Sequence, residues 1–309
     1  MLGVLGWIAG QGRLLLVAGL AAGIVLPGLA RAMEPMILPL IVVLLFLSAL
    51  RIDPLAALPR GRGWPRALGL VLLMQTGFPL VAVVLLWAAG WLSAPLAVGV
   101  VLALSGPPLT GSPGIAILTG APPAPALRQM VLGTALLPLT VLPVFWLMPV
   151  FGDTGDVLAG TGRLLAIVLV AGGGGIVVRR MVPRWQAPGP QRAVEGLIAL
   201  AMGLVVIGLM SAVGPALMAA SPVFWLTLAA AFAISFGVQV AVALFFRCRD
   251  PEAAPALGIV AGNRNVALFL GALPAETAAV LLLFIGCYQV PMYLTPFVMV
   301  RFYRWVGRG

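Results

Sequence analysis

The sequence predicts an all-α integral membrane protein with about ten transmembrane helices. Of its 309 residues, 62% are hydrophobic and only 8% are charged, whereas soluble domains carry about 25% charged residues. The chain therefore has too little polar surface to face water on all sides, and lipid is expected to surround most of it. Because backbone groups in lipid must be satisfied internally, the long apolar runs are expected to be helices.

Apolar runs of roughly 20 residues, the length that crosses a bilayer as a helix, recur along the whole chain. We expect spans near residues 13–31, 35–51, 65–90, 94–120, 126–150, 160–180, 192–217, 221–246, 252–273 and 275–301. The run 126–150 contains Pro138 and Pro143 and is expected to be one kinked helix, since neighbouring helices can satisfy the freed backbone groups. The stretches between spans are too short to form a soluble domain.

The arginines predict the orientation of these spans. All 18 basic residues are Arg, and Arg264 alone falls deep within a span. With ten spans, fifteen of the others lie on the side of the two termini, and only Arg31 and Arg163 lie on the opposite side. The positive-inside rule then places both termini in the cytoplasm, with the protein in the cell (plasma) membrane. This scattered pattern argues against nucleic-acid binding, which needs a basic face on a soluble domain.

The predicted spans divide equally between two halves of the chain, residues 1–155 and 156–309. An odd number of spans in each half, here five, makes the second half insert upside down relative to the first. This is the plan of the inverted repeats found in many secondary transporters. We therefore expect two inverted five-helix repeats.

Both halves interrupt their fourth span with residues that do not continue a helix. The first interruption, Ser105–Gly114, holds three prolines and three glycines in ten residues, and these are the poorest helix formers. The second, Gly262–Asn265, places Asn-Arg-Asn between two apolar runs. Interrupted segments at corresponding places in two halves point to the binding site of a secondary transporter. For either break alone, a simple kink or close helix packing is the alternative.

The predicted substrate- or ion-binding residues come from these two breaks and from the third span of the first half. They are Gln75, Thr110, Ser112, Asn263, Arg264 and Asn265. The third span of the second half carries Ser235 and Gln239. Gln239 is the counterpart of Gln75, and both glutamines are expected in the wall of the site or in bonds to a neighbouring helix. The run Gly172–Gly175 follows no strand and is expected to pack helices closely, not to bind a nucleotide.

The acidic residues argue against several function classes. All eight map to predicted loops or span ends, and the chain contains no His. A proton relay inside the membrane normally needs such a group. A lipid-modifying enzyme such as a prenyl transferase usually needs clustered Asp or His with a metal. We therefore expect no enzymatic activity and no cofactor.

Arg264 has three interpretations. A charge at this depth is costly and is expected to face a partner or a cavity. The guanidinium group could take the place of a bound cation by pairing with carbonyls at helix C-termini. It could bind an anionic substrate directly, since guanidinium suits carboxylate. It could instead snorkel to the membrane interface.

At these residues the chain resembles the bile acid:sodium symporter family. The resemblance rests on the Pro-Gly-rich break ending in Ser112-Pro113, on the Gly262–Asn265 break and on Gln75, and it covers nearly the whole chain. It implies discontinuous helices 4 and 9 that cross each other, a panel of helices 1, 2, 6 and 7, and a core of helices 3–5 and 8–10. It also implies a substrate bound between panel and core and moved by alternating access.

The resemblance also implies sodium sites, but several of their side chains are replaced here. The family has Asn where this chain has Pro113, and a Gln where it has Arg264. Its hydroxyl groups and its carboxylate fall on apolar residues, which are Ala126, Met130 and Val260. Ser112 and Gln75 are kept and are the candidate sodium ligands, but Arg264 would repel the ion. Sodium coupling is therefore doubtful.

These observations predict a secondary transporter that moves a small organic anion across the membrane by alternating access. A facilitator or an anion exchanger fits the residues better than a sodium symporter does. An auxin-carrier-like efflux protein and a non-transporting membrane receptor or scaffold are the alternatives. The expected partners are the organic anion and the lipid bilayer, with no nucleic acid and no obligate protein partner.

Overall fold

The protein is all-α in the part that the structure describes. The computed structural model describes residues 2–53, 57–59 and 61–308, and these ranges contain helices and turns but no β-strand. The helices, with 3₁₀ and π-helical segments labelled η, are α1 (Leu2–Gly10), α2 (Gly12–Val25), α3 (Pro27–Met33), η1 (Glu34–Met36), α4 (Ile37–Arg51), η2 (Gly61–Gly63), α6 (Trp64–Leu72), η3 (Leu73–Gly77), α7 (Phe78–Ala88), α8 (Pro95–Ser105), α9 (Ser112–Thr119), α10 (Pro123–Leu147), η4 (Pro149–Phe151), α11 (Thr154–Ile167), η5 (Val168–Gly173), α12 (Gly174–Met181), η6 (Pro183–Gln186), α13 (Pro188–Leu209), α14 (Val213–Met218), α15 (Pro222–Arg247), α16 (Ala254–Gly262), η7 (Val266–Gly271), α17 (Ala275–Val298) and α18 (Val300–Val306).

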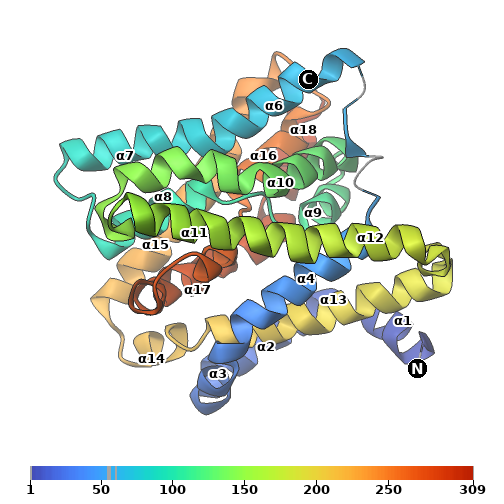
Figure 1. The fold of residues 1–309 in the computed structure, drawn as a ribbon, viewed down its shortest axis with the longest axis horizontal. Coiled ribbons are helices and arrows are strands. Elements are labelled where there is room, and N and C mark those ends of the chain that lie inside the picture. Colours follow the sequence, from blue (N-terminus) through green and yellow to red (C-terminus); the bar gives the residue numbers. More distant parts are fainter. Residues whose placement is uncertain (1, 54–56, 60, 309) are drawn as a thin grey trace. The chain divides into compact units, whose positions relative to one another are not determined.

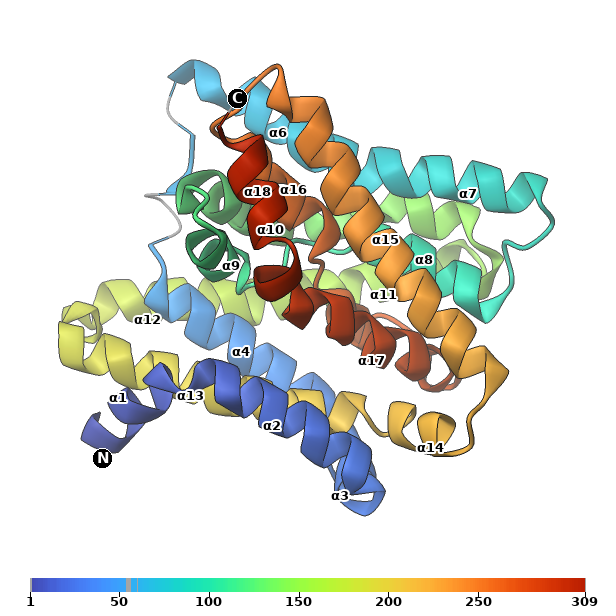
Figure 2. The same cartoon turned by 180° about the vertical axis from the view of Figure 1, so that it is seen from behind.

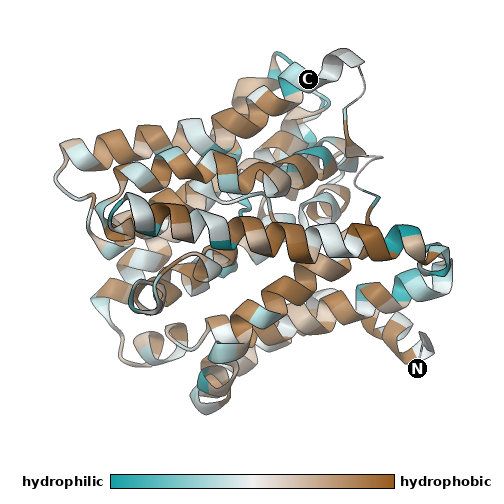
Figure 3. Ribbon diagram, viewed as in Figure 1, coloured by the Kyte–Doolittle hydropathy of each residue, from teal (hydrophilic) through white to brown (hydrophobic). Residues whose placement is uncertain are grey.

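The length and the apolar surface of these helices make the chain a multi-pass membrane protein. Among the described residues, seven continuous helices are long and apolar enough to cross a membrane, and a bent pair near the N-terminus would make an eighth. Apolar side chains face outward along them. Val81, Val84 and Leu85 of α7, for example, are 61%, 59% and 65% exposed. Figure 3 shows hydrophobic residues along most of the length of α7. Apolar surface this extensive needs lipid as its solvent.

The count of ten spans stays a prediction. The seven helices and the bent pair correspond to eight of the predicted spans. The other two, 94–120 and 252–273, are the ones with interruptions, and each is present as two shorter helical segments. The run 126–150 was expected to be one helix, and α10 continues through Pro138 and Pro143.

The first predicted boundary is wrong by several residues. The sequence placed the turn between the first two spans near residues 31–35, but the helix breaks at Leu26, whose φ of −114° and ψ of 71° are not helical. The next residue is Pro27, which disfavours the α conformation in the residue before it. From Pro27 the helical stretch continues to Arg51 and is long enough to span.

The chain forms two compact units, each of which draws on both halves of the sequence. Unit 1 contains residues 1–56 and 165–225, and unit 2 contains residues 57–164 and 226–309. Figures 1 and 2 show the helices of each unit from opposite sides. The inverted relation between the sequence halves 1–155 and 156–309 stays a prediction.

Unit 1 is organised around α13. This helix packs against α1, α2 and α4, and small residues let the backbones approach closely. A Cβ atom on Gly196 would lie only 2.1 Å from Leu5 O. At one end of the unit, Arg51 forms an ion pair with Glu195 (3.3 Å), and Arg179 donates to the backbone oxygens of Leu50 and Arg51 at 3.0 Å.

The glycine run of unit 1 packs helices closely, as predicted, but only at one of its ends. A Cβ on Gly175 would lie 2.5 Å from Phe46 O and 2.8 Å from Ala49 Cβ, both on α4. Around Gly172 and Gly173 there is no atom within 4 Å of the corresponding position in the described structure. The contact therefore depends on Gly175.

Unit 2 holds the two interrupted segments. Its long helix α10 contacts α6, α9 and α16, and α8 contacts α17. Between α6 and α7 lies a π-helical turn, η3, which contains Gln75. Such turns occur often at functional sites because they release backbone groups from the regular α pattern.

We expect Gly175→Ala to destabilise the protein and Gly172→Ala to leave it unchanged or slightly more stable. The added methyl at 175 overlaps the backbone of α4, and overpacking of this kind costs about 1–3 kcal/mol. The methyl at 172 meets open space and lowers only the entropy of the unfolded chain. Thermal unfolding of both variants in detergent measures the difference. Equal melting temperatures would contradict the close packing at Gly175.

Candidate functional site

The first interruption follows directly from two consecutive prolines. A residue before proline is disfavoured in the α conformation, so Pro107 and Pro108 hold Gly106 and Pro107 out of the helix. Gly106 has a φ of −60° and a ψ of 152°, which is extended backbone. Helix α8 therefore ends at Ser105, and a new helix, α9, begins at Ser112 with Pro113 in its first turn.

The second interruption contains no proline and depends on its partner segment. In a continuous helix, the Asn265 N–H would donate to Ala261 O, four residues earlier. Instead it donates to Pro107 O (2.8 Å), while Leu109 N–H donates to Asn263 O (2.8 Å). Residues Pro108 and Arg264 thus form an isolated antiparallel bridge. The two breaks satisfy each other's backbone, as buried groups must.

The Arg264 side chain lies inside unit 2, and its bonds to described residues all go to backbone oxygens. It is 1% exposed. Its Nε donates to Ala261 O (2.8 Å), the oxygen that Asn265 N–H leaves free, and its Nη1 donates to Gly106 O (3.0 Å). Its Nη2 donates to Met74 O (3.2 Å). Each guanidinium nitrogen therefore has a carbonyl partner from a different helical segment.

The carbonyl of Met74 is available because of the π-helical turn. The N–H of Phe78, which would reach Met74 O in an α-helix, donates to Leu73 O instead. The next residue whose backbone could donate a hydrogen bond to Met74 O is Pro79, which has no N–H. This oxygen is therefore left without a donor from its own helix, and Arg264 supplies one.

The position of Arg264 is favourable electrostatically as well as geometrically. The C-terminal end of a helix carries about half a negative charge, and cations near it are stabilised. Arg264 bonds at the C-terminal ends of two helices, α8 through Gly106 and α16 through Ala261. One positive charge therefore compensates two helix ends inside the protein.

A connected polar network surrounds the second break. Gly262 O accepts from Ser235 Oγ (3.0 Å) and Tyr288 Oη (2.8 Å). Asn263 Oδ1 accepts from Thr295 Oγ1 (3.1 Å). Gln239 donates to Ser235 Oγ (3.1 Å) and Thr295 Oγ1 (3.2 Å) and accepts from Tyr303 Oη (2.7 Å). These bonds tie α15, α16, α17 and α18 together at the break.

A smaller network of the same kind lies beside the first break. Gln75 donates to Gly133 O (3.2 Å) and accepts from Thr140 Oγ1 (3.3 Å), both on α10. A Cβ on Gly133 would lie 2.9 Å from Pro108 Cδ and 3.0 Å from Gln75 Nε2. Gly133 thus lets α10, the break and Gln75 come together. Gln75 and Gln239 both bond to neighbouring helices, which is the alternative that the sequence left open for them.

The structure places all six predicted site residues in unit 2, at or beside the paired breaks. Gln75, Ser112, Asn263 and Arg264 are buried, and Thr110 and Asn265 are partly exposed. Ser112 Oγ is buried without a hydrogen-bond partner in the described part of the chain. The interpretation that Arg264 snorkels to an interface is wrong, because its charge is bonded to carbonyls inside the unit. Whether these residues bind a substrate stays a prediction.

Sequence reasoning missed four members of the networks: Thr140, Tyr288, Thr295 and Tyr303. One signal was available for the two threonines. Each follows a leucine in the last predicted span of its half and lies between two prolines, Pro138 and Pro143 for Thr140, and Pro291 and Pro296 for Thr295. The tyrosines carried no such signal, since aromatic residues are common in apolar helices.

The oxygens at the paired breaks are a poor fit to a bound sodium ion. The backbone oxygens of Gly106, Pro107, Ala261, Gly262 and Asn263 each accept a bond from a donor of the protein itself. The unpartnered Ser112 hydroxyl is one ligand, whereas a hard cation needs several oxygens. The described residues contain no group of three or more His, Cys, Asp or Glu side chains that could hold a metal ion.

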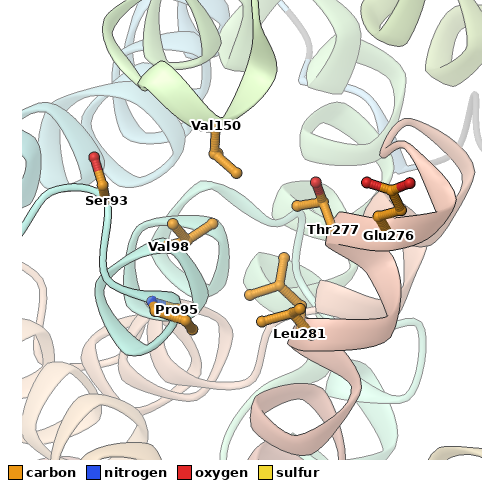
Figure 4. A pocket seen from close by; sticks show the side chains of 8 residues that line it. Ser93, Pro95, Val98, Val150, Glu276, Thr277 and Leu281 are labelled. Carbon is orange, nitrogen blue, oxygen red and sulfur yellow. The ribbon is translucent and has the colours of Figure 1, made fainter.

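A separate hollow of unit 2 contains none of the predicted site residues. It measures about 210 Å³ and lies between the start of α8 and the start of α17. Figure 4 shows the side chains of Val98, Val150 and Leu281 converging on it, with Thr277 and Glu276 at its edge. Its mostly apolar lining distinguishes it from the polar breaks.

Comparisons with known proteins identify no family for this chain. No protein-family model matches the sequence. No curated protein matches it either. The site therefore has to be interpreted from its own geometry.

We expect Arg264→Met to lower the thermal stability strongly and Arg264→Lys to lower it less. Methionine leaves three buried carbonyls without a donor, and each unsatisfied group costs about 1–3 kcal/mol. Lysine keeps the charge but lacks the planar fork that reaches three oxygens. Thermal unfolding in detergent measures both variants, with the exposed Arg301→Met as the matched control. If Arg264→Met melts at the same temperature as this control, the bonding role of Arg264 is wrong.

Proposed function

We propose that this protein is a secondary transporter for a small organic anion, located in the cell membrane with both termini in the cytoplasm. The observation that carries the proposal is the pair of interrupted helical segments that meet at Pro108 and Arg264. Non-helical backbone at membrane depth is tolerated where protein buries it or where it lines a cavity. In secondary transporters such segments form the binding site near the bilayer midplane.

Two further features support transport rather than a receptor or scaffold role. The chain has two compact units, and alternating access needs two bodies that can move against each other. The breaks also carry polar groups with capacity left for a ligand: the unpartnered Ser112 hydroxyl among the described residues, and the partly exposed Thr110 and Asn265. A purely structural kink would need none of them.

The charge at the breaks favours an anionic substrate. Among the described residues, Arg264 is the only buried charged side chain. The electric field of its positive charge extends beyond the atoms to which it is hydrogen-bonded. In a medium of low dielectric constant this charge attracts an anion held nearby and repels a cation. We assign the direct substrate contacts to Thr110, Ser112 and Asn265, with Asn263 and Gln75 supporting them.

The same charge supports transport without sodium coupling. A sodium ion stabilises interrupted helices by compensating the partial charges of their carbonyl ends. Here the guanidinium group of Arg264 bonds to those ends directly. We therefore propose that Arg264 is a built-in cation that replaces the ion, and that the protein works as a facilitator or an anion exchanger.

We expect liposomes containing the protein to take up an amphipathic organic anion equally well in sodium and in potassium buffer. Radiolabelled taurocholate and hippurate are suitable probes because both stay charged at neutral pH. Thr110→Val and Asn265→Ala should each weaken the apparent affinity about tenfold, the value of one hydrogen bond to a charged group. Ser93→Ala, which lies outside the breaks, is the control. Uptake no greater than in protein-free liposomes for every anion tested would reject the proposal.

We also expect the melting temperature of the purified protein to respond equally to sodium, potassium and choline chloride. An ion that binds only the folded state adds about 2.7 kcal/mol of stability at one hundred times its Kd. A saturable rise that only sodium produces would mean that backbone and amide oxygens still form a sodium site. Sodium symport would then replace sodium-independent transport as the proposed mechanism.

A further inference from the structure

A hollow lined by four charged side chains lies at one end of unit 2, away from the paired breaks. It has a volume of about 430 Å³ and lies among the start of α6, the start of α10 and the turn between α15 and α16. Figure 2 shows α6 and α16 at this same end of the unit, and Figure 1 agrees. Four charged residues line it: Arg66, Arg128, Asp250 and Glu252.

Two of these charges are already paired with each other. Arg66 Nη2 donates to Asp250 Oδ2, and Asp250 Oδ1 also accepts from Ala253 N–H (3.2 Å) at the beginning of α16. The negative charge of Asp250 thus compensates both the positive end of that helix and the positive charge of Arg66. Glu252 is exposed, so water solvates its charge.

Unlike the exposed Glu252, Arg128 places a polar atom inside the protein without a partner among the described residues. It is partly buried, and its Nε is buried with no hydrogen-bond acceptor in the ranges that the structure describes. It forms no ion pair with a described residue, although Asp250 and Glu252 line the same pocket. A buried N–H donor without an acceptor is costly. Its planar fork is suited to bind two oxygens of a carboxylate or phosphate.

We infer that this pocket is an anion-binding site in which Arg128 holds a carboxylate or phosphate group. Gln129 lines the same pocket, and its side-chain amide donates a hydrogen bond to Ala67 O (3.3 Å). This bond holds the Gln129 side chain at the wall of the pocket. In the proposed orientation the pocket opens to the cytoplasm at the level of the lipid headgroups. The anion is then either a free cytoplasmic oxyanion or the phosphate of an anionic lipid.

The site is separate from the proposed transport site, so either proposal can be rejected while the other stands. Its residues are not those assigned to the substrate, and its test measures binding, not transport. The variant Arg128→Gln is expected to fold, because it removes a charge that has no partner among the described residues. Without an added anion it should melt at the same temperature as the wild-type protein or at a higher one.

The test is a titration of the purified full-length chain in detergent with sodium acetate and with sodium phosphate, against sodium chloride at the same sodium concentration. We expect a saturable rise in melting temperature for the wild-type protein and for Arg301→Gln, an exposed arginine of the same unit. Arg128→Gln should weaken the Kd about tenfold or more, as expected for a lost charged hydrogen bond. Glu252→Gln should keep or strengthen binding, since it removes a negative charge from the pocket.

A second arm separates the two sources of the anion. Native mass spectrometry compares phosphatidylglycerol with phosphatidylcholine bound to the wild-type protein and to Arg128→Gln. A preference for phosphatidylglycerol that depends on Arg128, without a response to free anions, supports the site with a lipid as its ligand. A response to acetate or phosphate supports it with a free oxyanion. The inference is overturned if neither arm responds, if Arg128→Gln behaves like Arg301→Gln, or if Glu252→Gln abolishes binding.

Discussion

The buried guanidinium group of Arg264 is the interaction on which the centre of unit 2 depends. Interrupting two helices leaves carbonyl oxygens that water cannot reach, and each would destabilise the fold if left unpaired. Arg264 bonds to Ala261, Gly106 and Met74, one oxygen from each of three helical segments. The cost of burying its charge is offset by the negative ends of α8 and α16. The break and the charge therefore stabilise each other, and neither is expected to persist alone.

The polar networks around the breaks extend the same principle. Gln239, Thr295 and Tyr303 connect the second break to the C-terminal helices, and Gln75 connects the first break to Thr140. The backbone oxygens of Gly106, Pro107, Ala261, Gly262 and Asn263 all have a protein partner, so the centre of unit 2 is expected to move as one rigid body. In unit 2, three buried side-chain atoms have no partner among the described residues: Ser112 Oγ at the centre, Arg128 Nε at the end of the unit, and Thr161 Oγ1. Buried polar atoms of this kind mark where a ligand would be accommodated at least cost.

Arg264 and Arg128 carry the same charge, but their different surroundings give the two side chains different roles. The donors of Arg264 are directed at backbone oxygens of its own unit, so these donors are not available to a ligand. Arg128 lines a pocket of about 430 Å³ and forms no ion pair with a described residue, so its charge is available to a ligand. Both positions are compatible with the anionic substrate that we propose.

The sequence by itself determined that the chain is helical, that lipid surrounds it and where both interruptions fall, because apolar composition and prolines act locally. It also identified α10 as one helix and Arg264 as the unusual buried charge. Only the tertiary structure decided that the two breaks pair through Pro107 and Asn265, and that Arg264 bonds to carbonyls and does not snorkel. It also revealed Thr140, Thr295 and the two tyrosines. The reason is physical: Met74 O, Gly106 O and Arg264 are up to 190 positions apart in the chain, and no local pattern specifies which donor meets which acceptor after the helices pack.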